Sequence, residues 1–426
     1  MSFFKQVGNA MMMAARAHAE WEIDVSHTIL RSKKRLFVLG LFLLPAVIGS
    51  IAFADQIGEA MPKLLGGKEA YTPAFYTTGI FIASILIGIC AGLITGGIGA
   101  GGGFVIAPAL MSAGIKGILA VGTDLFHIFA KAIMGSVIHK KLGNISVPLA
   151  VIFLIGSIIG ATTGGIINRV LYEINPVLSD AFITIVYVIM LGGLGFYALG
   201  DYFKARKSSD SDSGGAHGGK SEGTDMGNLP KKLQSINIPP MITFDQGIVP
   251  GGRQISAIFL VMSGALVGLT AAIMGVGGGF LTFPIFVYVL GVSSLTTVGT
   301  DILQIVFTAG YASISQYAIY GFIFYTLAMG MLLGSLIGIQ VGALVTKVVK
   351  GITIRGFYAL AVLGGFVNRF FALPKKLADL DIISLPQSVA SILNIIGSWA
   401  FFIIVGTFAV WVIGTFFMNL KTLKGE

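Results

Sequence analysis

The chain has 426 residues, of which 55% are hydrophobic and only 11% are charged. Soluble globular domains carry about 25% charged residues, so this composition excludes an ordinary soluble domain. A net charge of +9 would suit a nucleic-acid-binding protein, but apolar runs long enough to cross a bilayer recur along the chain, and we assign the charge to loops. The sequence predicts an all-α polytopic membrane protein. Its single cysteine, Cys90, excludes an internal disulfide and a cysteine-based metal cluster.

The N-terminal region, 1–35, precedes the first long apolar run. Its apolar side chains recur at helical spacing between basic residues, which predicts an amphipathic helix on the membrane surface; a frayed tail is the alternative. The run 36–54 follows a basic cluster and ends in Ala52-Phe53-Ala54, which resembles a signal-peptidase site. Because the region before it is too long for a signal peptide, we expect 36–74 to form a retained membrane helix and an outer loop.

The next unit, 75–203, has five apolar segments, of which the second is only half the length of a membrane helix. They are 75–96, 108–115, 118–139, 147–171 and 181–199. A polar stretch, 204–253, follows, and its Ser-, Asp- and Gly-rich centre predicts a flexible cytoplasmic linker.

The unit 254–373 repeats the pattern of the first unit. Its segments are 255–272, the half-length 284–290, 295–320, 322–345 and 357–373. The remainder, 374–426, contains an outer loop and a last membrane helix over about 392–418.

Both units carry the same motifs in the same order, at nearly constant offset. A glycine-rich break, at 96–104 or 274–280, is followed by Pro108 or Pro284 and then by the tetrad Gly-Thr-Asp-Leu or Gly-Thr-Asp-Ile. Glycine ladders at 156, 160 and 164 and at 334, 338 and 342 also correspond, and such ladders let membrane helices pack closely. We interpret the ladders as structural.

An odd number of segments gives the two units opposite orientations. The hairpin at 139–143 contains Lys140 and Lys141, whereas its counterpart at 317–321 has no charge, so the first faces the cytoplasm and the second faces out. Among the positive charges, Arg169 and Arg369 are assigned to outer loops. Both termini are then cytoplasmic, and inverted repeats with broken helices are typical of secondary transporters.

Two polar stripes lie inside the third segments of the units. The first consists of Asp124, His127 and Lys131, which share one helix face, and the second of Asp301, Gln304 and Thr308 at the same spacing. Ionisable groups inside a membrane are expensive and therefore indicate function by default.

Each stripe also has a simpler interpretation. The aspartates could cap the first turns of their helices, where a carboxylate also suits the helix dipole. Lys131 could bind an anion or pair with an aspartate. His127 could be a packing residue or a proton acceptor, because imidazole titrates near neutral pH.

The glycine breaks favour an anion as ligand. Successive N–H groups of bare backbone, with the N-terminus of a half-helix starting near Pro108 or Pro284, form a positively polarised cradle. No Gly-Lys-Ser/Thr follows either break, which excludes a Walker-type phosphate loop. The alternative is that these glycines only permit close helix crossing.

The two Gly-Gly-Gly-Phe breaks with their prolines and the paired Gly-Thr-Asp tetrads resemble the sulfite exporter TauE/SafE family of bacterial membrane transporters. The resemblance covers roughly 75–200 and 255–373. It implies transport of sulfite or small organosulfonates such as sulfoacetate, usually as export across the inner membrane.

We therefore expect a transporter of a small oxyanion or sulfonate by alternating access, and no enzyme. Residues assigned to substrate binding are Gly99, Gly101, Gly102, Gly103, Thr123, His127, Lys131, Gly275, Gly277, Gly278, Gly279, Thr300, Gln304 and Thr308. Residues assigned to proton coupling are Asp124, Asp301 and His127.

Two other functions stay open: a cation carrier that uses Asp124 and Asp301 as ligands, and an intramembrane aspartyl protease that brings them together. No cofactor, metal or nucleic acid is expected. The expected partners are a small anionic solute and membrane lipid, and a homodimer stays open. The expected location is the bacterial inner membrane.

Overall fold

The computed structural model describes 78–98, 102–139, 146–209, 228–245, 251–277, 281–282, 285–345, 348–349 and 351–419, together with 32–34 and 37. The predicted surface helix at 1–35 and the predicted membrane helix at 36–54 lie almost wholly outside these residues.

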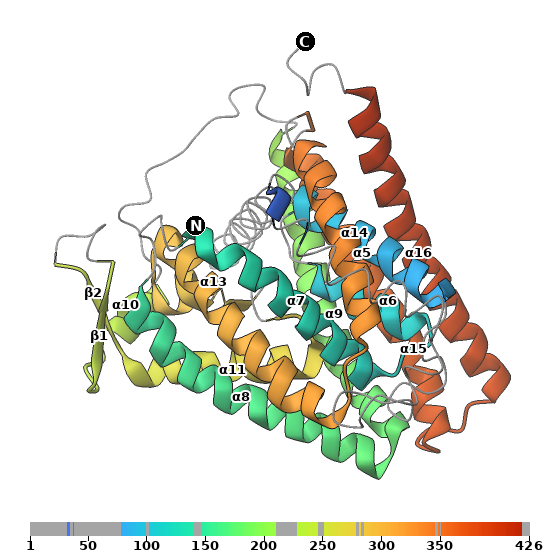
Figure 1. Ribbon diagram of the computed structural model, residues 1–426, viewed down its shortest axis with the longest axis horizontal. Coiled ribbons are helices and arrows are strands. Elements are labelled where there is room, and N and C mark those ends of the chain that lie inside the picture. Colours follow the sequence, from blue (N-terminus) through green and yellow to red (C-terminus); the bar gives the residue numbers. More distant parts are fainter. Residues whose placement is uncertain are drawn as a thin grey trace.

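The chain is a bundle of helices with one short hairpin (Figure 1). The first unit forms α5 (Thr78–Ile98), α6 (Gly103–Ser112), α7 (Gly117–His139), α8 (Val147–Ile174) and α9 (Pro176–Ser209). Between the units lie α10 (Asn228–Gln234) and the antiparallel strands β1 (Met241–Phe244) and β2 (Arg253–Ser256), paired Met241 to Ser256 and Phe244 to Arg253. The second unit forms α11 (Ala257–Met274), η2 (Ile285–Leu290), α13 (Ser294–Tyr311), η3 (Ala312–Tyr317), η4 (Ala318–Tyr320), α14 (Tyr325–Val345) and α15 (Gly351–Asp379), and α16 (Gln387–Met418) ends the bundle.

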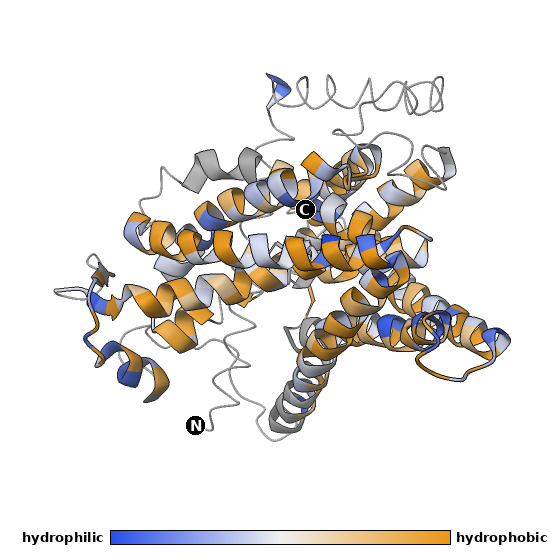
Figure 2. Cartoon of the chain, turned by 90° about the horizontal axis from the view of Figure 1, so that it is seen from below, coloured by the Kyte–Doolittle hydropathy of each residue, from blue (hydrophilic) through white to orange (hydrophobic). Residues whose placement is uncertain are grey.

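Within the described ranges, 7 helices are long and apolar enough to cross a membrane. Figure 2 shows hydrophobic residues along most of their length. Large apolar side chains point outward on them, such as Ile159 of α8 (54% exposed) and Val410 of α16 (73% exposed), as expected of helices that face lipid. The predicted class of all-α polytopic membrane protein is confirmed.

Three local expectations need correction. The half-helix α6 begins at Gly103, so Pro108 lies inside it and not at its start. Proline commonly marks a helix start, but the preceding glycine break allows the chain to turn into a helix sooner. Part of the predicted flexible linker, 204–253, is regular structure: the end of α9, then α10 and β1.

The third correction concerns two arginines that were assigned to outer loops. Arg169 lies in α8 and is 9% exposed, and Arg369 lies in α15 and is 2% exposed. Burial of both guanidinium groups is possible because neighbouring polar groups accept hydrogen bonds from them.

The two units pack on each other through glycine-lined seams. In the α8–α11 seam, a Cβ on Gly156 would lie 1.9 Å from the Val261 carbonyl oxygen, and one on Gly160 would lie 2.0 Å from that of Ala265. The corresponding α5–α14 seam has Gly334 against Ile85 at 2.2 Å and Gly338 against Ile89 at 2.3 Å. These backbones are in direct contact, which supports the structural interpretation of the ladders.

The seams also bear on the relative orientation of the units. Contacting residue numbers rise together in both seams, so α5 runs parallel to α14 and α8 runs parallel to α11. Each seam joins the first segment of one unit to the fourth segment of the other. In the predicted path of the chain through the membrane, the first and fourth segments of one unit run in opposite directions. When the first segment of one unit is parallel to the fourth segment of the other, one unit must therefore be inverted relative to the other. The packing therefore supports the inference of inverted repeats.

Gly156→Ala is expected to destabilise the protein, because its Cβ has no room against the α11 backbone. Overpacking of this kind lowers the free energy of unfolding by about 1–3 kcal/mol. The measurement is thermal unfolding of purified protein in detergent. Gly193→Ala in α9 is the control, since nothing lies within 4 Å of that Cβ. Equal unfolding temperatures for the two variants would contradict the close seam.

Candidate functional site

The structure brings the two helix breaks into contact. A Cβ on Gly103, the first residue of α6, would lie 2.9 Å from the Cα of Val276 in the second break. One on Gly275 would lie 2.9 Å from the Cα of Val121 in α7. Gly275 and Gly277 adopt φ values of 80° and 68°, which glycine adopts without strain, so the chain can turn sharply there.

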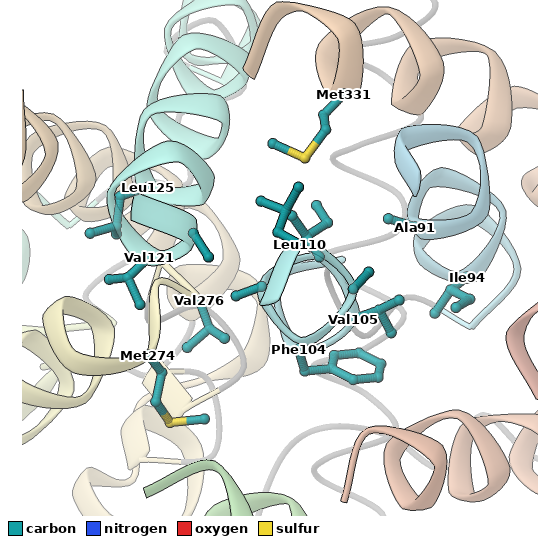
Figure 3. Packing of buried hydrophobic residues seen from close by; sticks show 14 of the residues in the cluster. Ala91, Ile94, Phe104, Val105, Leu110, Val121, Leu125, Met274, Val276 and Met331 are labelled. Carbon is teal, nitrogen blue, oxygen red and sulfur yellow. The ribbon is translucent and has the colours of Figure 1, made fainter. Parts of the chain in front are cut away.

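Most side chains around this contact are apolar. Figure 3 shows Phe104 and Val105 of α6, Val276 of the second break, and Val121 and Leu125 of α7 packed around it. A polar group also reaches it, because Oδ2 of Asp124 lies 3.3 Å from the Cβ position of Gly103. The carboxyl group of Asp124 is therefore beside the N-terminus of α6, where the first N–H groups of a helix have no partner within it.

The polar stripe of α7 is buried. Asp124, His127 and Lys131 are 0%, 1% and 4% exposed. Nδ1 of His127 lies 3.5 Å from Oδ1 of Asp124, and its Nε2 lies 3.2 Å from Oγ of Ser335 in α14. Among the residues that the structure describes, neither carboxyl oxygen of Asp124 nor Nδ1 of His127 has a hydrogen-bond partner. Buried polar atoms without partners are rare and unfavourable, so this pair is a candidate for the functional site.

The stripe of α13 differs from its counterpart because its hydrogen bonds are made. Nε2 of Gln304 donates to Oδ1 of Asp301 at 2.9 Å and to Oγ1 of Thr282 at 3.1 Å. Thr308 donates to Oε1 of Gln304 at 2.8 Å, and its Oγ1 lies 2.7 Å from Oγ of Ser157 in α8. The two stripes correspond in sequence, yet of the two only the α7 stripe has acceptors for which the described part of the chain supplies no partner.

Neither aspartate caps its own helix. Helix α7 begins at Gly117 and α13 at Ser294, so Asp124 and Asp301 lie about two turns inside. The N-cap of α13 is Ser293, whose Oγ accepts from the Thr296 N–H at 3.3 Å. The capping interpretation is wrong, because both helices start earlier than the Thr-Asp pair suggested.

The neighbouring threonines, assigned above to substrate binding, have a different partner. Oγ1 of Thr123 accepts from the N–H of Phe324, just before α14, at 2.9 Å. Oγ1 of Thr300 accepts from the N–H of Ser146, at the start of α8, at 3.1 Å. Each threonine therefore satisfies a helix N-terminus of the other unit. Their hydroxyl oxygens hold the two units together at equivalent positions.

The glycines assigned to substrate binding also separate into groups. Gly102 and Gly103 are buried at the N-terminus of α6. The N–H of Gly275, which was assigned to substrate binding, donates to the Ala271 carbonyl at 2.8 Å and closes the end of α11. Gly277 adopts the positive φ of 68° given above. The other glycines of this set, Gly99, Gly101, Gly278 and Gly279, lie outside the described residues.

Three residues of the site were missed in the sequence. Asn168 donates to the carbonyls of Ala272 and Ile273 at 3.3 and 3.4 Å, and the hydroxyls of Tyr187 and Tyr317 donate to those of Met274 and Ala272. The carbonyls at the broken end of α11 are thus already bonded. An asparagine in an otherwise apolar segment was the available signal; the tyrosines resemble ordinary core residues.

The chain is a bundle of membrane-crossing helices, and two broken segments meet inside it beside buried ionisable residues. This architecture is typical of a secondary transporter. The class of protein that the fold and the site define is therefore a polytopic membrane transporter.

Comparison with known proteins agrees. The family model "Sulfite exporter TauE/SafE" matches 84–368. The chain is similar to "Probable membrane transporter protein YjnA" of Bacillus subtilis (strain 168), with 24% identity over 62% of this chain and 89% of that protein. It is also similar to "Sulfite exporter TauE/SafE family protein 3" of Arabidopsis thaliana, with 24% identity over 37% of this chain and 34% of that protein. No solved structure matches the chain.

Because the family model spans more than half of its length, the chain belongs to the TauE/SafE sulfite exporter family.

Gln304→Leu is expected to destabilise the fold, because it removes the amide that donates to Asp301 inside the bundle. A buried acceptor left without its partner costs about 1–3 kcal/mol. Thermal unfolding in detergent measures the effect, with Ser157→Ala at the far end of the network as the control. Ser157→Ala should cost less, since Thr308 keeps its bond to Gln304. A neutral Gln304→Leu would contradict the network.

Proposed function

We propose that this protein moves a small oxyanion, sulfite or a small organosulfonate, across the bacterial inner membrane by alternating access and in the direction of export. The observation that carries the proposal is the meeting of the two breaks at Gly103 and Val276, beside the stripe of α7 that bears Asp124 and Lys131. The names of the family and of the Arabidopsis relative, which refer to sulfite export, support the solute class.

Two groups in this region favour negative charge. The N-terminus of α6 starts at the buried pair Gly102-Gly103, where the helix dipole and the first N–H groups point toward a ligand. Lys131, on the same face of α7 as Asp124, brings a buried amino group into the bundle. In the proposal the anion is held between these two groups.

Asp124 lies beside the place proposed for the anion, because its Oδ2 is 3.3 Å from the Cβ position of Gly103. A carboxylate and an oxyanion repel each other there, whereas a protonated carboxyl group donates a hydrogen bond. Anion binding and protonation of Asp124 therefore favour each other, which couples the solute to a proton. His127, at 3.5 Å from Asp124, is the group that passes the proton on.

A cation carrier fits these contacts less well. Asp301 accepts from a Gln304 amide, and the carbonyls at the end of α11 accept from Asn168 and two tyrosines. These oxygens are occupied by hydrogen-bond donors, so they offer few ligands to a metal ion.

An aspartyl protease needs two carboxyl groups that share a proton within hydrogen-bonding distance. Asp301 is among the described residues, and none of these is a hydrogen-bond partner of the Asp124 carboxyl oxygens. The required pair is therefore not formed.

Lys131→Met should abolish anion binding, because it removes the buried amino group and keeps the length of the side chain. In a thermal-shift screen against sulfite, sulfate, sulfoacetate, taurine, isethionate and acetate, a bound solute raises the unfolding temperature of the parent protein by mass action. The same solute should have no effect on the Lys131→Met variant and its full effect on Lys375→Met, a control in α15. A normal shift in Lys131→Met would reject the assignment.

Asp124→Asn should uncouple solute from protons. Purified protein is reconstituted in liposomes with a fixed anion gradient, and flux is measured with and without an imposed pH gradient. The parent should respond to the pH gradient; the variant, which keeps the shape of the side chain, should not. Asp379→Asn, at an exposed carboxylate at the end of α15, is the matched control and should keep the response. Parent flux that ignores the pH gradient would overturn the coupling.

A further inference from the structure

Each unit has a joint where its half-helix turns into the next full helix. In the first unit α6 passes through Gly114, at φ 94°, into α7; in the second η2 passes through Gly291, at φ 74°, into α13. These joints lie next to the helices that carry the two polar stripes. The contacts that hold each joint therefore affect how the helix with the stripe can move.

Membrane helices of the bundle hold the α6–α7 joint. Oδ1 of Asp180 in α9 accepts from the N–H of Gly117, the first residue of α7, at 2.7 Å. Lys376 in α15 pairs with the same carboxylate at 2.8 Å. Arg369, also in α15, donates to the Pro108 carbonyl at 3.3 Å and to Oγ of Ser112 at 2.8 Å, near the end of α6.

The η2–α13 joint is held by the segment between the units. Asp245, directly after β1, accepts from the N–H of Ser293 at 2.9 Å and from its hydroxyl at 2.7 Å, at the start of α13. Arg253 of β2 lies 3.4 Å from that carboxylate and donates to the Gly291 carbonyl at 2.9 Å. Gln234 of α10 donates to the Leu290 carbonyl, at the end of η2, at 2.8 Å.

The two joints thus receive the same three contacts. A carboxylate accepts from the N-terminus of the full helix, a cation pairs with that carboxylate, and side-chain donors bind carbonyls of the half-helix or the turn after it. The source differs: one joint is held by α9 and α15, and the other by α10, β1 and β2, which Figure 1 shows together at one edge of the bundle. This second set, 228–245 with 251–256, is called the linker clamp below.

We propose that Asp245 and Arg253 are positioning residues that lock the η2–α13 joint, and that release of the linker clamp opens this end of the transporter. The 7-residue helix α10 and the strands β1 and β2 are not membrane helices, whereas α9 and α15 are, so the linker clamp is the support that is more easily released. Motion of the joint would reach the stripe of α13 directly, since Gln304 bonds both Asp301 and Thr282, which precedes η2. The claim that release of the clamp opens the transporter rests on the proposed function. The claim that Asp245 and Arg253 hold the joint does not.

The test uses a cysteine at Val292, which is 2% exposed and lies between Gly291 and Ser293. In a Cys90→Ala background, Val292→Cys is labelled with a membrane-impermeant maleimide from the side that carries the linker clamp. Adding Asp245→Ala should speed labelling about tenfold or more, because hydrogen bonds to a charged group are strong enough to shift an opening equilibrium by that factor. Asp379→Ala is the matched control, since its exposed carboxylate accepts from Gln387 at 2.8 Å and belongs to α15, outside the linker clamp.

Arg253→Gln provides a second variant if Asp245→Ala does not fold; it keeps a donor for Gly291 but removes the charge, and it should give a smaller increase. Labelling rates equal to the parent in folded variants would overturn the clamp. Labelling needs no solute, so this result does not depend on the proposed function. Faster labelling with unchanged transport in liposomes would overturn the role of the clamp in opening.

Discussion

A broken helix inside an apolar bundle must find partners for the backbone groups that its break releases, because no water is available to them in the membrane. This requirement explains many of the polar contacts in the protein. The carbonyls at the end of α11 receive Asn168, Tyr187 and Tyr317, and the end of α6 receives Arg369. Several buried polar side chains are therefore the partners of these ends.

Many of these partners come from the opposite unit, so the two units depend on each other. Thr123 bonds the start of α14, and Thr300 bonds the start of α8. Asn168 of the first unit bonds the end of α11 in the second. Together with the backbone contacts of the two glycine seams, these bonds make α5 with α14, and α8 with α11, into closely packed parallel pairs. Motion is then expected at the joints and not within the pairs.

The corresponding stripes of α7 and α13 differ in their hydrogen bonding, although they occupy equivalent positions in the two units. On α13 the amide of Gln304 links Asp301 to Thr308 and thereby satisfies the buried carboxyl group. On α7 the corresponding position is His127, which faces Asp124 at 3.5 Å without a hydrogen bond and turns its other nitrogen to Ser335. The stripe of α13 therefore stabilises the fold, whereas among the described residues the Asp124 carboxyl group of the α7 stripe has no hydrogen-bond partner.

The sequence by itself determined the class of protein, the order of the segments, the correspondence of the two units and the stripes on α7 and α13. These follow from local properties: apolar length, helical spacing and repeated motifs are visible without contacts. Only the tertiary structure decided which polar residues serve the backbone and which stay available. The capping interpretation of Asp124 and Asp301 was wrong because both helices begin earlier in the chain than the Thr-Asp pairs suggested. The outer-loop placement of Arg169 and Arg369 was wrong because their hydrogen-bond partners, such as Gln316 and Pro108, lie far away in the chain, and spacing along a single helix carries no record of them.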